Sequence, residues 1–475
     1  MVRTRIAPSP TGFPHIGTIY QVLFDYAVAH KANGQFVFRL EDTDRARLVD
    51  GAEEAVYESL AWFGLNPDES PVVGGPCGPY RQSERLDIYR PYVDELIVKG
   101  HAYHCFCTKE RLEEMRKQQE IEHKPPMYDR LCRGLSAEEI KKNLDAGMAY
   151  VVRMKVPDGE VLAFDDVIAG HIEFKSELID DQVLLKTDGF PTYHMAVVVD
   201  DHLMKITHIL RGKEWISSTP KHVLLYRFFG WDMPIHAHLP LILNSDGKGK
   251  LSKRHGHSSV NYYRERGYLP EAILNYMSLI VWNHPEKKEI YGLDEFVNLF
   301  EISGITSQGP RFDLAKLDWV NGQWIRTMLT DSDLIQRIKA YSKYSVEQIE
   351  RVLPLVKERL VRLDEFDELV AFFFNDVEAY DSSLLIPKNK SAADVKDVLP
   401  TIIERLDVMS TWTHADLESA LRGIVEEKGW KVGELFMVVR VAVTGRTATP
   451  PLFETMEVIG KPECLVRLRN SLSLV

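Results

Sequence analysis

The sequence predicts an α/β protein in which an open parallel sheet is interrupted by an insertion and followed by an all-helical C-terminal region. Residues 2–38 have the pattern of a strand, a helix and a second strand. Residues 181–209 contain a second apolar and β-branched block, and the sequence after Trp319 keeps helical spacing. A chain of 475 residues is also long enough for about three domains.

The N-terminal strand, helix and strand place a loop where a ligand is expected. Residues 2–6 are partly β-branched, and three prolines before Gly17 exclude regular structure from the loop that follows them. Helical spacing then continues until the strand-like QFVFRL. Such a unit forms a Rossmann-type sheet, which binds ligands beyond the carboxyl ends of its strands. At that edge we expect the 7–17 loop and the acidic groups Glu41, Asp42 and Asp44.

The rest of the chain divides by its patterning. Apolar residues between 83 and 100 predict a helix that leads into a cysteine-containing insertion, and the segments DQVLLK and MAVVVDD suggest that the sheet resumes. The predicted division is 1–80 and 188–250 for the two halves of the Rossmann-type domain, 81–187 for the insertion, 251–325 for a mixed region and 326–475 for the helical region.

The composition is that of a soluble globular protein, with 45% hydrophobic and 27% charged residues. The net charge of −12 argues mildly against a partner as acidic as RNA, but basic patches can exist on an acidic protein. No segment approaches the roughly 20 apolar residues of a membrane-spanning helix, and the N-terminus lacks the layout of a secretory signal. We therefore expect a cytoplasmic protein without a membrane partner.

Two segments have the composition of a phosphate-binding site. In APSPTGFPHIGT a helix begins after His15, and a helix N-terminus offers unpaired amides and a partial positive charge. Thr18 adds a hydroxyl, and Gly17 permits close approach of a nucleotide. The segment KGKLSKR surrounds glycine and serine with basic residues. The alternatives are an ordinary helix cap at His15 and a solvated basic loop.

HIGT at 15–18 and KLSKR at 250–254 resemble the two signature motifs of class I aminoacyl-tRNA synthetases. RIAPSPTGFPHIGT, RLEDTD, GPYRQSER, DGFPTYH, VVDDHLM and RGKEW make the chain similar to glutamyl-tRNA synthetases of the bacterial type. The resemblance runs from residue 3 to about 325, and more loosely to the C-terminus. It implies a monomer that activates glutamate with ATP and Mg²⁺, usually only with tRNA bound. Glutamate then passes from the adenylate to the 3′-terminal adenosine of tRNA(Glu) in translation.

The resemblance assigns catalytic roles to His15 and Lys253, with Lys253 as the principal loop lysine at the phosphates. Attack of a carboxylate on the α-phosphate spreads negative charge over the phosphate oxygens, which a lysine loop and helix-end donors stabilise. The residues that it implies for ATP binding are His15, Gly17, Thr18, Glu214, Lys250, Leu251, Ser252, Lys253 and Arg254.

A glutamate substrate carries two carboxylates and one ammonium group, so its pocket needs cations and an anion. The resemblance implies Arg5 and Arg211 for the side-chain carboxylate and Glu41 for the ammonium group. The other residues that it implies for glutamate binding are Ala7, Ser9 and Tyr193. The alternatives are an edge-strand surface position for Arg5 and a capping or salt-bridge role for Glu41.

Cys105, Cys107 and Cys132 give three thiols in the insertion, which favours a structural Zn²⁺. Three free cysteines without a metal are the alternative. Some family members have a Cys-x-His pair where this chain has Cys132 and Gly134. Tyr128 is a candidate fourth ligand by resemblance to a shorter synthetase-like paralogue, and His104 and His123 are further candidates.

The resemblance assigns acceptor-end binding to residues 81–187, stem contacts to 251–325 and anticodon binding to 326–475. Arg359 in KERLVRLDEF matches the arginine that reads the third anticodon base, and an ordinary helix-surface arginine is the alternative.

Two other functions remain open from the sequence. One is a different enzyme on the same fold, either a nucleotidyltransferase or a tRNA-modifying glutamate activator, although both normally lack the long helical C-terminal third. The other is a catalytically silent RNA-binding or regulatory paralogue, against which the intact His15 and Lys253 argue.

Overall fold

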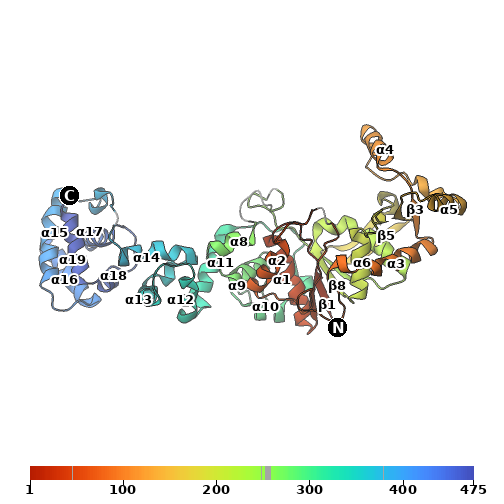
Figure 1. Ribbon diagram of the computed structural model, residues 1–475. Helices are drawn as coiled ribbons and strands as arrows, with labels where there is room; N and C mark the ends of the chain where they lie inside the picture. The colour runs from red at the N-terminus through yellow and green to blue at the C-terminus, as the bar shows by residue number, and fades with distance from the viewer. Residues whose placement is uncertain (45–46, 248, 252–257, 378) are drawn as a thin grey trace. The chain divides into compact units, whose positions relative to one another are not determined.

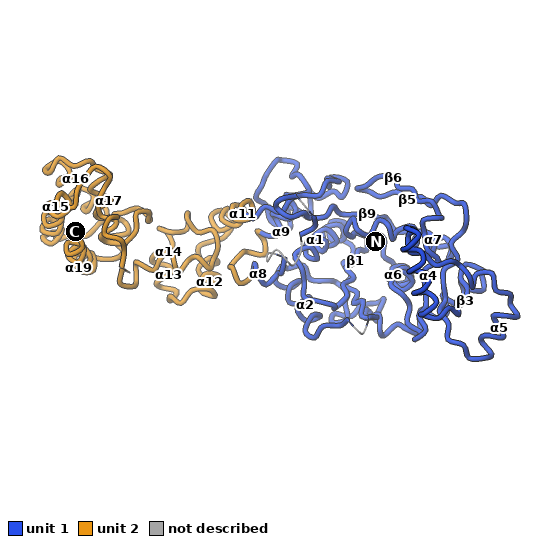
Figure 2. Tube along the Cα trace, turned by 90° about the horizontal axis from the view of Figure 1, so that it is seen from above, with its two compact units in different colours: residues 1–263, 273–314 blue, residues 264–272, 315–475 orange. Residues whose placement is uncertain are grey.

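The computed structural model describes residues 1–44, 47–247, 249–251, 258–377 and 379–475. These residues form two compact units, 1–263 with 273–314 and 264–272 with 315–475 (Figure 2). All strands formed by the described residues lie in the first unit, and the second unit is helical. No helix within the described ranges is long and apolar enough to cross a membrane.

The predicted N-terminal strand, helix and strand are confirmed (Figure 1). Strands β1 (Arg3–Ile6) and β2 (Gln35–Phe38) are parallel and are joined by helix α1 (Ile16–Lys31). The proline-containing loop before α1 has no helix or strand, as its sequence predicts. The loop therefore follows the carboxyl end of β1 and leads directly into the N-terminus of α1.

The parallel sheet continues through two later strands. The amide of Thr207 donates to the carbonyl of Arg3 at 2.9 Å, which places β8 (His208–Gly212) beside β1. Strand β9 (Ile235–Leu239) is parallel to β8. Strand β5 (Val161–Asp166) joins β9 through the pair Asp166 and His236, and β6 (Gly170–Lys175) is antiparallel to β5.

One predicted strand is wrong. The segment MAVVVDD belongs to helix α6 (Tyr193–Leu203), and its residues from Met195 to Asp201 are all buried. A run that is buried on all sides loses the periodicity that distinguishes a helix from a strand. The segment DQVLLK does contain strand β7 (Val183–Leu185), but β7 pairs with β4 rather than with the parallel sheet.

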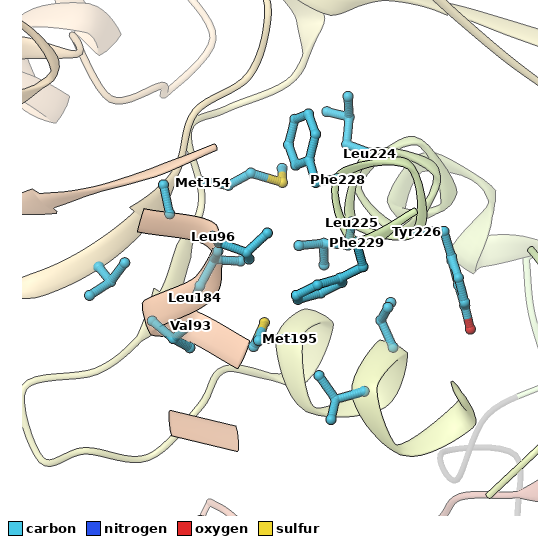
Figure 3. Close-up of a cluster of buried hydrophobic side chains, with 14 of the residues drawn as sticks. Val93, Leu96, Met154, Leu184, Met195, Leu224, Leu225, Tyr226, Phe228 and Phe229 are labelled. Atoms are coloured by element: carbon cyan, nitrogen blue, oxygen red, sulfur yellow. The ribbon is translucent and has the colours of Figure 1, made fainter. Parts of the chain in front are cut away.

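The segment predicted as an insertion shares its core with the parallel-sheet part of the first unit. Its antiparallel sheet has the order β3 (Ala102–Cys105), β4 (Val151–Met154) and β7. Side chains from β4 and β7 pack with helices α3 (Leu86–Val98), α6 and α7 (Thr219–Phe229) (Figure 3). The shared core therefore does not separate the predicted insertion from the second half of the Rossmann-type domain at residue 187. The predicted domain division stays a proposal.

The remaining elements of the first part of the chain are α2 (Ala52–Phe63), η2 (Gln82–Glu84), α4 (Lys109–Ile121), η3 (Leu131–Gly134), α5 (Ala137–Asp145), η4 (Ser176–Leu178), η5 (Lys213–Ser218), α8 (Val260–Glu265), α9 (Pro270–Leu279), α10 (Leu293–Leu299) and η7 (Ile302–Gly304). The elements that follow are α11 (Leu314–Thr327), α12 (Asp331–Lys339), α13 (Val346–Val356), η8 (Lys357–Arg359), η9 (Leu363–Glu365), α14 (Phe366–Phe374), η10 (Ser382–Leu385), α15 (Ala392–Asp407), α16 (His414–Lys428), α17 (Val432–Thr444), α18 (Leu452–Ile459) and α19 (Lys461–Leu472). The predicted helical C-terminal region is thus confirmed.

Candidate active site

Two cavities lie at the carboxyl-terminal edge of the parallel sheet, with volumes of roughly 260 and 750 Å³. Thr18, Gln21 and Trp215 line both of them. The two cavities therefore share a wall that includes the first turns of α1. Ligands bound in the two adjacent cavities would lie close to each other. A reaction between two substrates requires such an arrangement.

The smaller cavity is built around the N-terminus of α1. His15 is the N-cap residue of this helix, and its Nδ1 accepts a hydrogen bond from the amide of Gly17 at 2.9 Å. The ring proton of neutral His15 is therefore on Nε2, where it can be donated. His15 does cap the helix, but it also lines the cavity. All the described residues predicted for ATP binding line this cavity: His15, Gly17, Thr18, Glu214, Lys250 and Leu251.

The described residues of the two predicted motifs come together at this cavity. Lys250 lines it and forms an ion pair with Glu214. The carbonyl of Ser258 accepts a hydrogen bond from the amide of Ile16 at 2.8 Å. Leu251, which lines the same cavity, and Ser258 are thus both close to the N-terminus of α1. Ser252, Lys253 and Arg254 lie outside the described residues.

The larger cavity collects all the residues predicted for glutamate binding: Arg5, Ala7, Ser9, Glu41, Tyr193 and Arg211. They come from β1, the loop after it, the end of β2, the start of α6 and β8. Elements that are far apart in the sequence therefore contribute to a single polar cavity.

Arg211 is a buried cation with neutral partners. It is 4% exposed, its Nε donates to His238 at 3.1 Å and its other nitrogens lie 2.7 Å from Thr219 and 3.4 Å from His222. No carboxylate of the described chain forms a salt bridge with it. Burial accordingly lowers the pKa of Arg211 from its ordinary value. A ligand carboxylate in the larger cavity would supply the missing negative charge.

Arg5, in contrast, already has a carboxylate partner. Its Nε donates to Asp201 at 3.1 Å, and Asp201 also accepts from Arg39 at 2.7 Å. Arg39 is fully buried and donates from a second nitrogen to Glu41 at 3.0 Å. Arg5 therefore contributes less uncompensated positive charge to the cavity than Arg211 does.

Glu41 lies between this network and the cavity. Burial raises the pKa of Glu41 to about 7, although the neighbouring Arg39 acts in the opposite direction. A bound ammonium group would favour the ionised carboxylate and so lower this pKa. The carboxylate of Glu41 is thus suited to a cationic group of a ligand, whereas Arg211 is suited to an anionic group of the same ligand.

Comparison with known families decides the class of this chain. Residues 1–319 match the family described as tRNA synthetases class I (E and Q), catalytic domain, and residues 333–472 match the family described as anticodon binding domain. The chain belongs to the class I tRNA synthetases (E and Q). The resemblance seen in its motifs is therefore confirmed.

Full-length relatives agree. This synthetase is 46% identical to the glutamate–tRNA ligase of Acidothermus cellulolyticus over 486 aligned residues, which cover 100% of this chain and 96% of the relative. It is 43% identical to that of Acinetobacter baylyi over 474 residues, which cover 100% and 94%. Its fold matches the crystal structure of a glutamate tRNA ligase from Elizabethkingia meningosepticum in complex with its amino acid. The TM-score is 0.92, the identity 35% and the coverage 99% of each chain.

Several residues of the site in this synthetase are absent from the sequence predictions. Gln21 lines both cavities and lies one helical turn after Gly17, so its spacing could have placed it on the same face of α1. His222 and His238, which surround Arg211, come from α7 and β9 and carry no sequence signal that connects them with Arg211.

The three predicted cysteines also converge. Their sulfur atoms lie within 4.8 Å of one another, and the hydroxyl oxygen of Tyr128 lies 3.4 Å from Cys105 Sγ and 3.3 Å from Cys107 Sγ. The sulfur atoms of Cys107 and Cys132 are 3.5 Å apart. Three thiols and one phenol oxygen match the number and type of ligands that tetrahedral zinc accepts.

The alternative fourth ligands do not join this cluster. The ring of His104 packs against Tyr150, with ring centroids 4.9 Å apart, and His123 is exposed at the end of α4. Among the residues that the structure describes, the group that could hold a metal consists of the three cysteines, and it contains neither histidine. Tyr128 is the candidate whose donor atom faces the thiols.

Arg359, predicted to read the anticodon, ends the short helix η8 in the second unit and is exposed. Burial and the nearby charge of Arg359 together lower the pKa of Arg440. Two arginines that are close to each other form a small positive region, which suits a nucleic acid backbone or base acceptors.

Proposed function

We propose that this chain is a glutamate–tRNA ligase. It converts glutamate and ATP to glutamyl-adenylate and pyrophosphate, and then transfers glutamate to the 3′-terminal adenosine of tRNA(Glu). The observation that carries this proposal is the buried Arg211, which has neutral partners and faces a cavity whose wall it shares with the N-terminus of α1. A cation in that position favours an amino acid with an acidic side chain.

The shared wall accounts for the first step of the reaction. Glutamate would lie with its side-chain carboxylate at Arg211 and Arg5 and with its ammonium group at Glu41. Its reacting carboxylate would then face the smaller cavity, where the α-phosphate of ATP, bound with Mg²⁺, would lie near His15 and the α1 amides. Negative charge that develops on the phosphate would meet the Nε2 proton of His15 and the positive end of the helix.

The same geometry explains the selection of glutamate over glutamine. An amide in place of the carboxylate would leave Arg211 without a charged partner and would forfeit a charge-assisted hydrogen bond of about 1.5–3 kcal/mol. Discrimination of roughly 10- to 150-fold follows from that difference alone.

Glutamate-dependent exchange between ATP and pyrophosphate, measured with and without tRNA, tests the proposed function. We expect exchange with tRNA(Glu) present and little without it, followed by stable charging of tRNA(Glu). A tRNA-modifying activator would exchange without tRNA, and a silent paralogue would not exchange at all. Charging of tRNA(Gln) in parallel shows whether Arg359 restricts the enzyme to one anticodon.

The affinity for glutamate should depend on pH through Glu41. Because the pKa of Glu41 in the empty pocket is about 7, its carboxyl group is protonated below that pH and must lose the proton to bind an ammonium group. We expect the KM for glutamate to fall about tenfold from pH 6 to pH 8. Glu41→Gln should raise the KM and flatten this dependence, and a wild-type KM that is constant over this range would contradict the assignment.

We propose that residues 81–187 bind the acceptor end of tRNA, that 251–325 contact its stem and that 326–475 bind the anticodon, with Arg359 at the third anticodon base. The family assignment of 333–472 and the exposed Arg359, whose charge acts on the half-buried Arg440, support the last of these roles.

We further propose that Cys105, Cys107, Cys132 and Tyr128 hold one structural Zn²⁺. Removal of the metal should then lower the melting temperature, because zinc binding contributes directly to the stability of the folded segment. We expect about one zinc per chain by elemental analysis and its loss in Cys132→Ser, while Cys77→Ser, outside the cluster, should retain it. If protein purified without chelators contains no zinc, and a thiol reagent reacts with all three cysteines of the cluster, the cysteines are free and the proposed zinc site is wrong.

A further inference from the structure

Behind Arg211 lies a chain of buried hydrogen bonds that ends at Asp166. Nε of Arg211 donates to Nε2 of His238 at 3.1 Å, and Nδ1 of His238 lies 2.6 Å from Oδ2 of Asp166. The side chains of His238 and Asp166 are both 0% exposed. Neither residue lines the larger cavity, so neither would touch the substrate.

The donors in this chain fix the position of the proton on His238. A guanidinium group only donates, so Nε2 of His238 must accept and the ring proton must be on Nδ1. The hydroxyl of Thr219, 3.2 Å from the same Nε2, is compatible with this tautomer. The proton on Nδ1 is then donated to the carboxylate of Asp166, which holds the ring in that tautomer.

Asp166 is itself held by backbone amides. Its Oδ1 accepts from the amides of Ile168 at 3.0 Å and Ala169 at 2.7 Å, and its Oδ2 accepts from the amide of His238 at 3.0 Å. Burial raises the pKa of Asp166, but these hydrogen bonds and the one from His238 together bring the pKa below its ordinary value. The carboxylate is therefore a fixed, ionised acceptor at the end of β5.

We propose that Asp166 is a positioning residue that acts through His238 to fix the orientation of Arg211, and thereby sets the preference for glutamate over glutamine. This inference rests on the proposed function. An arginine whose Nε is anchored presents its remaining N–H groups in a fixed plane, which matches the two oxygens of a carboxylate. An arginine that can turn would present a single N–H and would accept an amide more readily.

Asp166→Asn tests this inference because the backbone amides determine how the asparagine must lie. Its oxygen would face the two amides of Ile168 and Ala169, which outweigh the single amide of His238, so its NH₂ group would donate to Nδ1 of His238. The ring proton would then move to Nε2 and oppose the Nε–H of Arg211. We expect the KM for glutamate to rise about tenfold and the ratio of kcat/KM for glutamate to that for glutamine to fall about tenfold. The KM for ATP should stay within about twofold of its wild-type value.

Asp181→Asn is the matched control. Asp181 is as buried as Asp166 and lies in the same predicted insertion, but it is hydrogen-bonded to Tyr103 at 2.7 Å and to the amide of Val156 at 3.1 Å. Asp181→Asn should leave the ratio of kcat/KM for glutamate to that for glutamine unchanged. A purely structural role for Asp166 predicts that both variants lose stability and that neither changes this ratio.

His238 provides a second test that does not require Asp166→Asn to fold. In His238→Gln the side-chain oxygen can take the place of Nε2 as an acceptor for Arg211, whereas the shorter His238→Asn cannot reach it. We expect the glutamine variant to keep most of the discrimination and the asparagine variant to lose it. Adding Asp166→Asn to His238→Gln should produce little further loss, because the acceptor no longer depends on Asp166.

Absence of glutamate-dependent exchange in the wild-type enzyme would refute the proposed function. If the wild-type enzyme is active but folded Asp166→Asn discriminates as the wild type does, the positioning role is overturned while the proposed function stands. Equal discrimination by His238→Gln and His238→Asn would overturn it as well.

Discussion

Arg211→Met is expected to raise the KM for glutamate at least about thirtyfold, because truncating one partner of a buried charge pair costs about 2–5 kcal/mol. Arg211 is the cation of the larger cavity that has only neutral partners, so the ligand carboxylate would be its main counter-charge. Methionine retains much of the side-chain volume and limits collapse of the cavity. The measurement is the steady-state kinetics of glutamate-dependent exchange with saturating ATP and tRNA.

The control for this change is Arg227→Met on α7, where the arginine pairs with Glu160 on the surface. Arg227→Met should alter neither the KM for glutamate nor the KM for ATP. The KM for ATP should also remain close to its wild-type value in Arg211→Met, because Arg211 does not line the smaller cavity. A rise of less than about threefold in the KM for glutamate would show that Arg211 does not bind the substrate carboxylate.

Lys253→Ala should lower the rate of adenylate formation by about 100- to 1,000-fold, the range for loss of one donor to a transition-state anion. Lys253 lies outside the described residues, but Leu251 lines the smaller cavity and Ser258 is hydrogen-bonded to Ile16 at the start of α1. The prediction for Lys253 itself rests on the resemblance of KLSKR to the family motif.

Single-turnover kinetics of adenylate formation measure that rate. The affinity for tRNA should change by less than about threefold. Lys99→Ala, at an exposed lysine that pairs with Glu95, is the control and should have no effect. Adenylate formation at the wild-type rate in Lys253→Ala would refute the catalytic role of the loop.

The elements that were predicted correctly have strong local signals. The N-terminal strand, helix and strand follow from prolines, glycines and helical spacing, and the helical C-terminal region follows from its periodic apolar residues. The segment MAVVVDD was misassigned because every side of it is buried, so only its neighbours in space determine that it is a helix.

In the site, too, residues with a local sequence signal could be predicted, and those that depend on neighbours in space could not. Residues with a motif around them, such as His15, Arg5 and Arg211, could be proposed from the sequence, and the structure brings them to two adjacent cavities. Their partners could not be proposed, because the pairing of Arg5 with Asp201 and of Arg211 with His238 depends on contacts between distant elements. The sequence therefore indicated which charges are present, but not which of them are already compensated.

The buried network of Arg5, Arg39, Asp201 and Glu41 has a consequence for protein engineering. Arg5 is paired through Asp201, so the exchange of Asp201 for an apolar residue leaves a buried arginine without its carboxylate, at a cost of about 3–5 kcal/mol. Changes to this network therefore call for replacement of a cation and an anion together, whereas Arg211, which has neutral partners, can be exchanged singly. Directed evolution that removes Asp201 in a single step would have to pass through an unstable intermediate.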